Sequence, residues 1–179
     1  MEYKYEITNK VNDSLIKEMI KLDKVFFKGE DVGTLSKCKE WLSVNDDIYT
    51  VLLLNKKVIG YINFIPITDD FYEKFKAGSV RDSNLSKSDV LTFSAEKPLK
   101  CLFTSIALNK RFRKTLALQM LWIGFLKKIK SYNVVIDSVI MDCVTDIGEK
   151  CAIKHLGAKF IRKSSSGKIY EGQIKEFIK

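Results

Sequence analysis

The sequence has a single histidine, His155, and only four cysteines, which lie far apart at Cys38, Cys101, Cys143 and Cys151. Neither residue type occurs at the short spacing of a structural metal site, so no resident metal ion is expected. Three of the cysteines stand in apolar runs, where a reduced thiol behaves as a small hydrophobic group. The cysteine usage therefore indicates a reduced, cytoplasmic protein.

Long apolar runs are also missing from the chain. No segment approaches the ~20 apolar residues that cross a bilayer, and the first ten residues lack the apolar centre of a signal peptide. Internal repeats and low-complexity segments are absent as well. We therefore expect a soluble, intracellular protein that has no membrane partner.

Glycine does not occur between Ser79 and Gly124, and the whole chain contains two prolines. Phosphate-binding loops usually carry glycine, because the backbone has to approach the phosphate closely. An ordinary glycine-rich phosphate loop in the middle of the chain is thus excluded.

Apolar residues and lysine are what the chain has in abundance. With 179 residues, of which 46% are apolar, the chain can bury one sizeable core, and we expect a single domain over residues 1–179. The formal net charge of +9 comes almost wholly from lysine, which on a surface usually serves solubility. Nucleic acid is accordingly not the expected partner.

Hydrophobic periodicity and turn residues predict alternating strands and helices. Strands are expected over residues 3–8, 48–54, 58–67, 101–108, 133–144, 158–163 and 168–178. Helices are expected from Leu15 to Phe27 behind cap oxygens of Asn12, Asp13 or Ser14, over 35–42 behind a Thr34 cap, after Asp69 and Asp70, from Thr115 to Lys130, and from an Asp146 cap to His155. This order predicts an α/β chain with a mixed sheet and helices on both faces.

The stretch 101–130 stands out within this order. An apolar, β-branched strand is followed by Asn109-Lys110-Arg111-Phe112-Arg113-Lys114, and then by an apolar helix that ends in lysines. The first N–H groups of a helix have no intrahelical acceptor, and its positive dipole end attracts anions. A strand, four cations and a helix start therefore predict an anion site, although lysine-rich chains also place cations in turns by chance.

Several residues of this order resemble the GNAT superfamily of acetyl-CoA-dependent N-acyltransferases. Ile106-Ala107-Leu108 and Phe112-Arg113 look like the first two elements of the family's cofactor motif, and Leu156-Gly157-Ala158 looks like the end of its later helix. The resemblance covers nearly the whole chain, down to a closing strand at 168–172. It implies a GNAT-like single domain with a central, mostly antiparallel twisted sheet.

The chain also departs from the family pattern. The two turn glycines of the family are replaced by Thr115 and Ala117 if the loop has lost a residue, or by Leu116 and Leu118 if it has not. The former keeps small residues toward the phosphates and is preferred. The family's frequent general-acid tyrosine is replaced by Ile153, so that role is vacant or is filled from elsewhere.

The resemblance implies that acetyl-CoA is the co-substrate. Backbone groups of Ile106, Ala107 and Leu108 would hold the pantetheine arm and polarise the thioester carbonyl. Residues of the connection would surround the pyrophosphate, namely Arg111, Phe112, Arg113, Lys114, Thr115, Leu116 and Ala117. Asp146, the expected cap of the later helix, would also belong to the cofactor site.

Acetyl transfer to an amine needs a base for the amine and a proton for the leaving thiolate. Asp142 is the candidate base, because burial in an apolar strand would raise its pKa, although a structural role is also open. Tyr170 is the candidate acid, with core packing as its alternative. Strand hydroxyls at Thr104 and Ser105 could orient an acceptor or a water. Covalent catalysis by Cys143 with His155 is the least favoured mechanism.

The leading hypothesis is an N-acetyltransferase acting on a primary amine of a small molecule or peptide by direct attack in a ternary complex. The alternative is a non-catalytic acyl-CoA-binding or regulatory module of the same fold, and a basic nucleic-acid binder comes third. By resemblance, acceptor residues would come from 26–33 and 68–97, which carry the aromatics Phe26, Phe27, Phe71, Tyr72 and Phe75 and the acids Glu30, Asp31, Asp69 and Asp70. A homodimer stays open.

Overall fold

The computed structural model of the protein describes residues 4–27 and 32–174. Its helices and strands follow in this order: β1 (Tyr5–Thr8), α1 (Asp13–Asp23), α2 (Leu35–Leu42), β2 (Tyr49–Leu54), β3 (Lys57–Ile67), α3 (Asp69–Ala77), the 3-10 turn η2 (Asp82–Asn84), β4 (Leu99–Leu108), the 3-10 turn η3 (Lys110–Phe112), α4 (Ala117–Ser131), β5 (Ile136–Cys143), α5 (Asp146–Leu156), β6 (Lys159–Lys163) and β7 (Lys168–Gly172).

The strands form one seven-stranded sheet in the order β1-β2-β3-β4-β5-β7-β6. The β4–β5 pair is parallel, whereas β1–β2, β2–β3, β5–β7 and β6–β7 are antiparallel. The predicted class, a mixed and mostly antiparallel sheet flanked by helices, is therefore confirmed.

The chain divides into two compact units, which we describe separately. The first unit contains residues Met1–Phe64 and Ser105–Asn133, and the second contains Ile65–Thr104 and Val134–Lys179. The strands β3 and β4 each contribute residues to both. A single domain over residues 1–179 stays a prediction.

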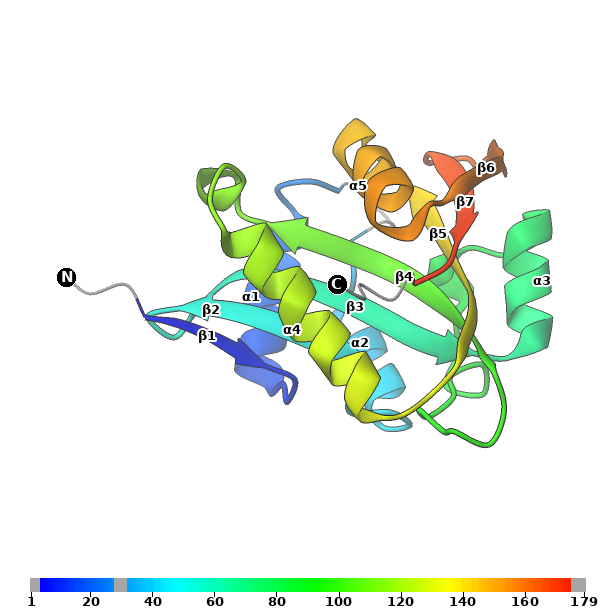
Figure 1. Ribbon diagram of the computed structural model, residues 1–179, viewed down its shortest axis with the longest axis horizontal. Coiled ribbons are helices and arrows are strands. Elements are labelled where there is room, and N and C mark those ends of the chain that lie inside the picture. The colour runs from blue at the N-terminus through cyan, green and yellow to red at the C-terminus, as the bar shows by residue number, and fades with distance from the viewer. Residues whose placement is uncertain (1–3, 28–31, 175–179) are drawn as a thin grey trace. The chain divides into compact units, whose positions relative to one another are not determined.

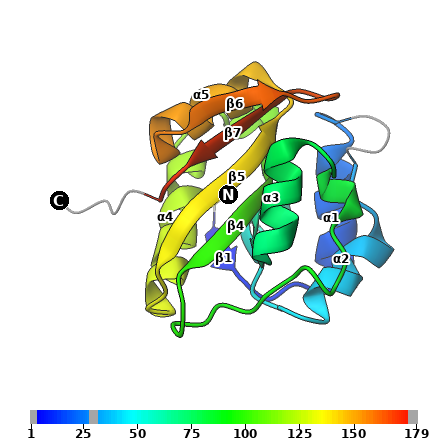
Figure 2. The same cartoon turned by 90° about the vertical axis from the view of Figure 1, so that its right-hand side faces the viewer.

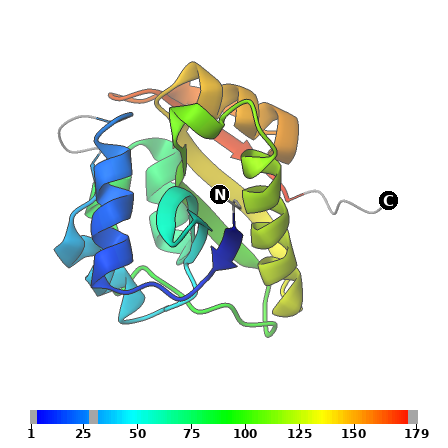
Figure 3. The same cartoon turned by 90° about the vertical axis from the view of Figure 1, so that its left-hand side faces the viewer.

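In the first unit, helices cover both faces of β2 and β3 (Figure 1, Figure 3). Tyr61 of β3 reaches Asp23 of α1 on one face, while the ring of Phe64 packs against Phe125 of α4 on the other, with ring centroids 5.1 Å apart. All six residues of β2 are buried. Because both faces are covered, β2 and β3 read as continuous apolar runs rather than as alternating strands.

The two strands predicted on either side of residues 55–57 form an antiparallel hairpin, β2 and β3, with a tight turn. Asn55 and Lys56 have φ values of 49° and 65°, as a two-residue hairpin turn with the right twist requires. Lys57, which was expected to belong to the turn, is the first residue of β3.

In the second unit, α3 and α5 lie on opposite faces of β7 (Figure 2). Tyr170 donates to Glu149 of α5, whereas the next residue, Glu171, accepts from Tyr72 of α3. Neighbouring strand residues point to opposite faces, so these two contacts fix which helix covers which side.

Two helix ends in the first unit differ from the prediction. Of the three cap candidates of helix α1, Asn12 is the one that caps it, its side chain accepting from the Leu15 N–H, but the helix ends at Asp23 rather than at Phe27. Beyond that point Val25 is 55% exposed, so no buried face continues the helix. Helix α4 begins at Ala117 instead of Thr115.

Two caps in the second unit also differ. Thr145, not Asp146, caps α5, because Thr145 has the extended backbone of a cap residue and its hydroxyl accepts from the Gly148 N–H at 3.1 Å. Asp146 is the first helical residue. Likewise Thr68, rather than Asp69 or Asp70, caps α3.

The segment after α3, in which the sequence predicts neither helix nor strand, packs in part into the core, and the last strand is shorter than predicted. Leu85 is fully buried and Val90 bridges to Ile67. The last strand ends at Gly172 instead of Ile178, and residues 175–179 lie outside the described part of the chain.

One lysine of the α4 end does not lie on the surface. Lys128 is 5% exposed, and its ammonium donates to the carbonyls of Asp47 at 2.7 Å and Tyr49 at 2.9 Å. Burial lowers the pKa of Lys128 to about 7. The lysine therefore fastens α4 to the start of β2 rather than complementing the helix dipole in solvent.

Within residues 4–27 and 32–174, no helix is both long enough and apolar enough to span a bilayer. Over the same residues, no three His, Cys, Asp or Glu side chains come together as a metal-binding group.

Candidate active site

The connection from β4 to α4 follows the end of a buried strand in the first unit. Ala107 and Leu108 are buried, and the Asn109 N–H donates to the carbonyl of Ile59 on β3 at 2.7 Å. The Asn109 side chain accepts from the Arg111 N–H, which opens η3. The predicted strand and basic turn are therefore built by ordinary strand pairing and a local cap.

This connection does not need glycine for its backbone. Among the described non-glycine residues, positive φ occurs at Asn55, Lys56 and Asn133, none of which lies in it. Arg113 and Leu116 have φ of −64° and −69°. The missing glycines are thus compatible with the turn, and what their loss affects is how closely a ligand can approach.

The four cations of the connection are not equivalent. Lys110, Arg111 and Lys114 are exposed, whereas Arg113 is half-buried. The Arg113 guanidinium stacks over the ring of Phe26 at 4.6 Å and its Nε donates to the Leu108 carbonyl at 3.4 Å. Lys110 also lies over the Phe26 ring, at 5.9 Å. The exposed cations therefore stay at the surface for an anion, while Arg113 is held more firmly by partners within its own unit.

The start of α4 is held by Thr115. The Thr115 hydroxyl donates to the Phe112 carbonyl at 2.7 Å and accepts from the Ala117 N–H at 3.2 Å. Ala117 is buried, and Leu116 is 70% exposed. Of the two alternative registers, the preferred one puts a buried alanine, and the other an exposed leucine, where the family carries glycine.

The structure does not place the candidate base and the candidate acid on the same face of the sheet. In the β5–β7 pairing Asp142 is opposite Ile169, and Met141 is opposite Tyr170. Since side chains alternate, Asp142 and Tyr170 point to opposite faces. Gly167 of the β6–β7 turn also covers Asp142, because a Cβ on Gly167 would lie 2.8 Å from its Oδ1. The two residues cannot serve one reacting atom together.

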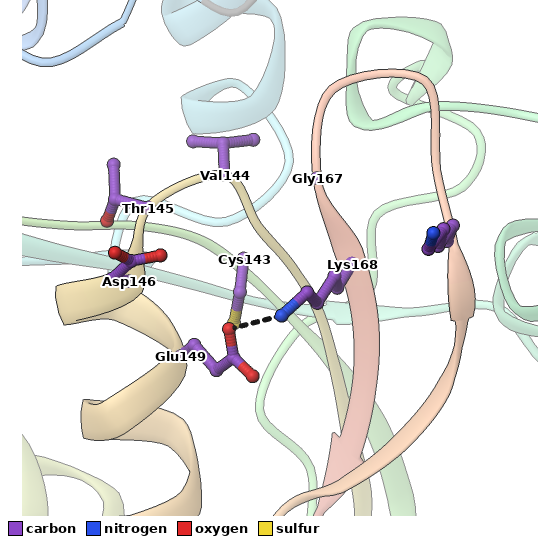
Figure 4. Close-up of a pocket in the computed structure, with 8 residues that line it drawn as sticks. Cys143, Val144, Thr145, Asp146, Glu149, Gly167 and Lys168 are labelled. Carbon is purple, nitrogen blue, oxygen red and sulfur yellow. Dashed lines mark hydrogen bonds and ion pairs between the residues drawn. The ribbon is translucent and has the colours of Figure 1, made fainter.

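Tyr170 hydrogen-bonds to Glu149, which lines a small pocket of the second unit. Figure 4 shows this pocket. The Tyr170 hydroxyl and the Lys168 ammonium both donate to Glu149, and the lysine does so at 2.8 Å. These hydrogen bonds, the one from Lys168 first, lower the pKa of Glu149. The pocket has a volume of about 210 Å³ and is lined by Cys143, Val144, Thr145, Asp146, Glu149, Lys163, Gly167 and Lys168.

The pocket geometry also bears on covalent catalysis. Burial, followed by the charge of Asp142, raises the pKa of Cys143 to about 12. A thiol attacks as its thiolate, and this one stays protonated at neutral pH. Burial also lowers the pKa of His155. The structure therefore gives the Cys143 and His155 hypothesis no support.

Of the aromatic residues expected near an acceptor, those of α3 lie in the core, whereas Phe26 and Phe27 are half-buried. Phe71, Tyr72 and Phe75 of α3 are at most 3% exposed, and Phe26 lies under Arg113. The acids Asp69 and Asp70 pair with Lys100 and Lys74. Glu30 and Asp31 lie outside the described residues.

Sequence reasoning missed one constellation, which lies in the first unit. Asp23 is 5% exposed and accepts a 2.5 Å hydrogen bond from the hydroxyl of Tyr61, which is 2% exposed. The Ser105 hydroxyl of β4 hydrogen-bonds in turn to the Tyr61 oxygen. Asp23 follows Ile16 and Met19 on the buried stripe of α1, and that spacing was the available signal.

Burial is the main influence on this group. It raises the pKa of Asp23 to about 6, against the smaller opposing effect of the Tyr61 hydrogen bond. Within the described residues, no lysine or arginine forms an ion pair with Asp23. The first unit therefore holds a buried carboxylate that changes its charge close to neutral pH.

Comparison with known proteins identifies the fold. No protein-family model matches the sequence, and no curated protein matches it either. Solved structures do match over nearly the whole chain, and many of them are N-acetyltransferases of the GNAT family. The chain therefore has the GNAT fold, as the resemblance predicted.

Three of these structures illustrate the likeness. A GNAT-family acetyltransferase from Staphylococcus aureus has 13% identity and a TM-score of 0.59, with 96% of this chain and 100% of that chain covered. The PaiA N-acetyltransferase from Thermoplasma acidophilum, solved with coenzyme A, has 10% identity and a TM-score of 0.57, covering 95% and 99%. GphF, a GNAT-like decarboxylase solved with isobutyryl-CoA, has 12% identity and a TM-score of 0.65, covering 95% and 100%.

Proposed function

We propose that the protein is a CoA-dependent N-acetyltransferase, which moves the acetyl group of acetyl-CoA to a primary amine by direct attack in a ternary complex. The observation that carries this proposal is the exposed basic connection at the end of β4, on a chain with the GNAT fold. The acceptor is proposed only as an amine of a small molecule or peptide. A cytoplasmic location remains a prediction.

The residues of the connection suit a CoA pyrophosphate. Lys110, Arg111 and Lys114 are exposed just ahead of a helix start, where N–H groups and the dipole favour an anion. Charge-assisted hydrogen bonds from these side chains would add to that attraction. Ala107 and Leu108 are buried at the end of β4, and their backbone N–H and C=O groups would bind the pantetheine arm.

The other residues predicted for the site would contribute less to binding the cofactor than the exposed cations do. Phe112, Thr115, Leu116 and Ala117 would shape the turn rather than bind phosphate by charge. Asp146 is a carboxylate, so it would accept a hydrogen bond from an amide rather than approach a phosphate. Tyr170 would act as an acid only by releasing its bond to Glu149.

A thermal-shift measurement with CoA and with acetyl-CoA tests the proposal. A ligand at a hundred times its dissociation constant stabilises the folded state by about 2.7 kcal/mol, which is readily seen as a higher midpoint. The double variant Arg111→Ala with Lys114→Ala should lose most of this shift. The matched control, Lys154→Ala with Lys159→Ala, removes two exposed cations elsewhere and should keep it. A wild type that shows no shift with either ligand contradicts the proposal.

The alternative is a non-catalytic acyl-CoA-binding module, and two exposed side chains favour it. Leu116 stands 70% exposed at the start of α4, and Ile153, where the family has its acid, is 48% exposed. A module of this kind would show the same thermal shift. Measuring CoA thiol release with a set of primary amines separates the two, because the module would bind without turnover.

A further inference from the structure

Three hydroxyl and carboxyl groups of the first unit are aligned in one direction. Ser105 donates to the Tyr61 oxygen, and Tyr61 donates to Asp23 Oδ1 at 2.5 Å. Each donor thus passes its hydrogen toward the carboxylate. Three separate elements supply the groups, namely β4, β3 and the last residue of α1.

Ser105, the most exposed of the three hydrogen-bonded residues, lies at the proposed reaction centre. Ser105 is half-buried, while Tyr61 and Asp23 are almost fully buried. Ser105 directly precedes Ile106, the first of the strand residues proposed to hold the acyl-pantetheine arm. An amine that attacks the thioester there would contact the Ser105 oxygen before it could contact Tyr61 or Asp23.

The carboxylate of Asp23 lies near a residue that lines an open pocket. A Cβ placed on Gly33 would lie 4.0 Å from Asp23 Oδ2, so Gly33 is a close neighbour of this oxygen. Gly33 lines an open pocket of about 690 Å³ together with Ile20, Lys24 and Thr34.

We propose that Ser105, Tyr61 and Asp23 form a proton relay that removes the ammonium proton of the acceptor before acetyl transfer. Ser105 is the residue that touches the amine, and Tyr61 and Asp23 act through it. The inference rests on the proposed function, because it assigns the base that this function lacks.

The proton count of the step balances. The ammonium proton passes to Ser105 as the Ser105 proton passes to Tyr61 and the Tyr61 proton passes to Asp23, which becomes the neutral acid. The free amine then attacks the carbonyl carbon, the C–N bond forms and the C–S bond breaks. The second proton of the nitrogen goes to the departing sulfur, and Asp23 later returns its proton to water.

The surroundings of Asp23 suit this role. The groups that face it are Tyr61 from β3, Tyr49 from β2 and Cys38 from α2. Burial raises the pKa of all three above the ordinary value, so they stay neutral near pH 7. Asp23, whose pKa burial raises to about 6, is ionised at pH 7 and basic enough to take a proton.

The test measures acetyl-CoA turnover with spermidine, lysine methyl ester and a peptide with a free N-terminus, between pH 5 and pH 9. Asp23→Asn should lower kcat by about 10²- to 10⁴-fold and abolish the rise in rate through pH 6, with CoA affinity unchanged. Ser105→Ala should lower kcat similarly without a lower thermal midpoint. Ser105→Thr should restore the rate, because it returns the hydroxyl.

Glu171→Gln serves as the matched control, since it alters a carboxylate of the second unit that is bound by a tyrosine, Tyr72, and should leave the rate unchanged. If wild type turns over and both Asp23→Asn and Ser105→Ala retain its rate and pH profile, the relay is overturned while the proposed function stands. If wild type binds CoA but acetylates none of the three amines, the proposed function fails and the relay fails with it.

Discussion

The two units each bury a tyrosine that donates to a carboxylate, but only one unit supplies a cation. In the second unit Glu171 accepts from Tyr72 at 2.6 Å and from Lys76 at 2.7 Å. In the first unit Asp23 accepts from Tyr61, and no cation of the described residues pairs with it. The same two side-chain types therefore stand in opposite electrostatic settings.

The two carboxylates respond in opposite directions. Burial acts to raise the pKa of Glu171, but the bonds from Lys76 and Tyr72 outweigh it, and the pKa is lowered. For Asp23, burial prevails and the pKa rises to about 6. A carboxylate held with a lysine stays charged and fastens α3 to β7, whereas one buried alone is ready to exchange a proton.

Removing each tyrosine hydroxyl should give the largest difference between the units. Tyr61→Phe leaves a buried carboxylate without its donor and should cost roughly 2–3 kcal/mol at pH 7. Tyr72→Phe leaves Glu171 its lysine and should cost about 1 kcal/mol. Urea unfolding of the two variants measures both values, and equal losses would contradict the contrast.

The pH dependence of stability should carry the next largest effect. The native pKa of Asp23 lies above its unfolded value of 3.8, so its contribution is fully present below pH 3.8 and is lost as pH rises through about 6. Relative to Asp23→Asn, wild type should therefore lose roughly 2 kcal/mol between pH 4.5 and pH 7. Unfolding both proteins across this range gives the difference directly, and parallel curves would argue against an elevated native pKa.

Taking the lysine away from the second pair should have the smallest effect. In Lys76→Met, Glu171 keeps its burial and loses its cation, so its pKa should rise as that of Asp23 does. Both side chains are about a third exposed, so stability should fall by at most about 1 kcal/mol. A carboxyl NMR titration of Glu171 follows the pKa, and an unshifted value would show that Lys76 is not what keeps it low.

The helix caps and the turns were predictable from residues that are neighbours in the sequence. Thr34 caps α2, Gly157 ends α5 with a positive φ, and Asn55 with Lys56 turns the hairpin, because each effect depends on neighbours within a few residues. The basic connection after Leu108 was predictable for the same reason.

The site residues were harder because they depend on register and burial. Nothing in the sequence fixes the pairing of Met141 with Tyr170, which places Asp142 on the other face. Asp23 resembles any helical carboxylate until Tyr61 is brought to it across 38 positions of the chain. The sequence locates the strand that would hold the cofactor, but not the acid and base around it.

The outer strand β6 has a consequence for how copies of the chain meet. It is the last strand of the sheet order, five residues long, with exposed Lys159 and Lys163 at its ends. Short edge strands with lysine resist pairing with a strand of another molecule, because each new ladder would bring like charges together. Any homodimer of this protein is therefore expected to form through some other surface, and β6 disfavours edge-to-edge aggregation at its own edge of the sheet.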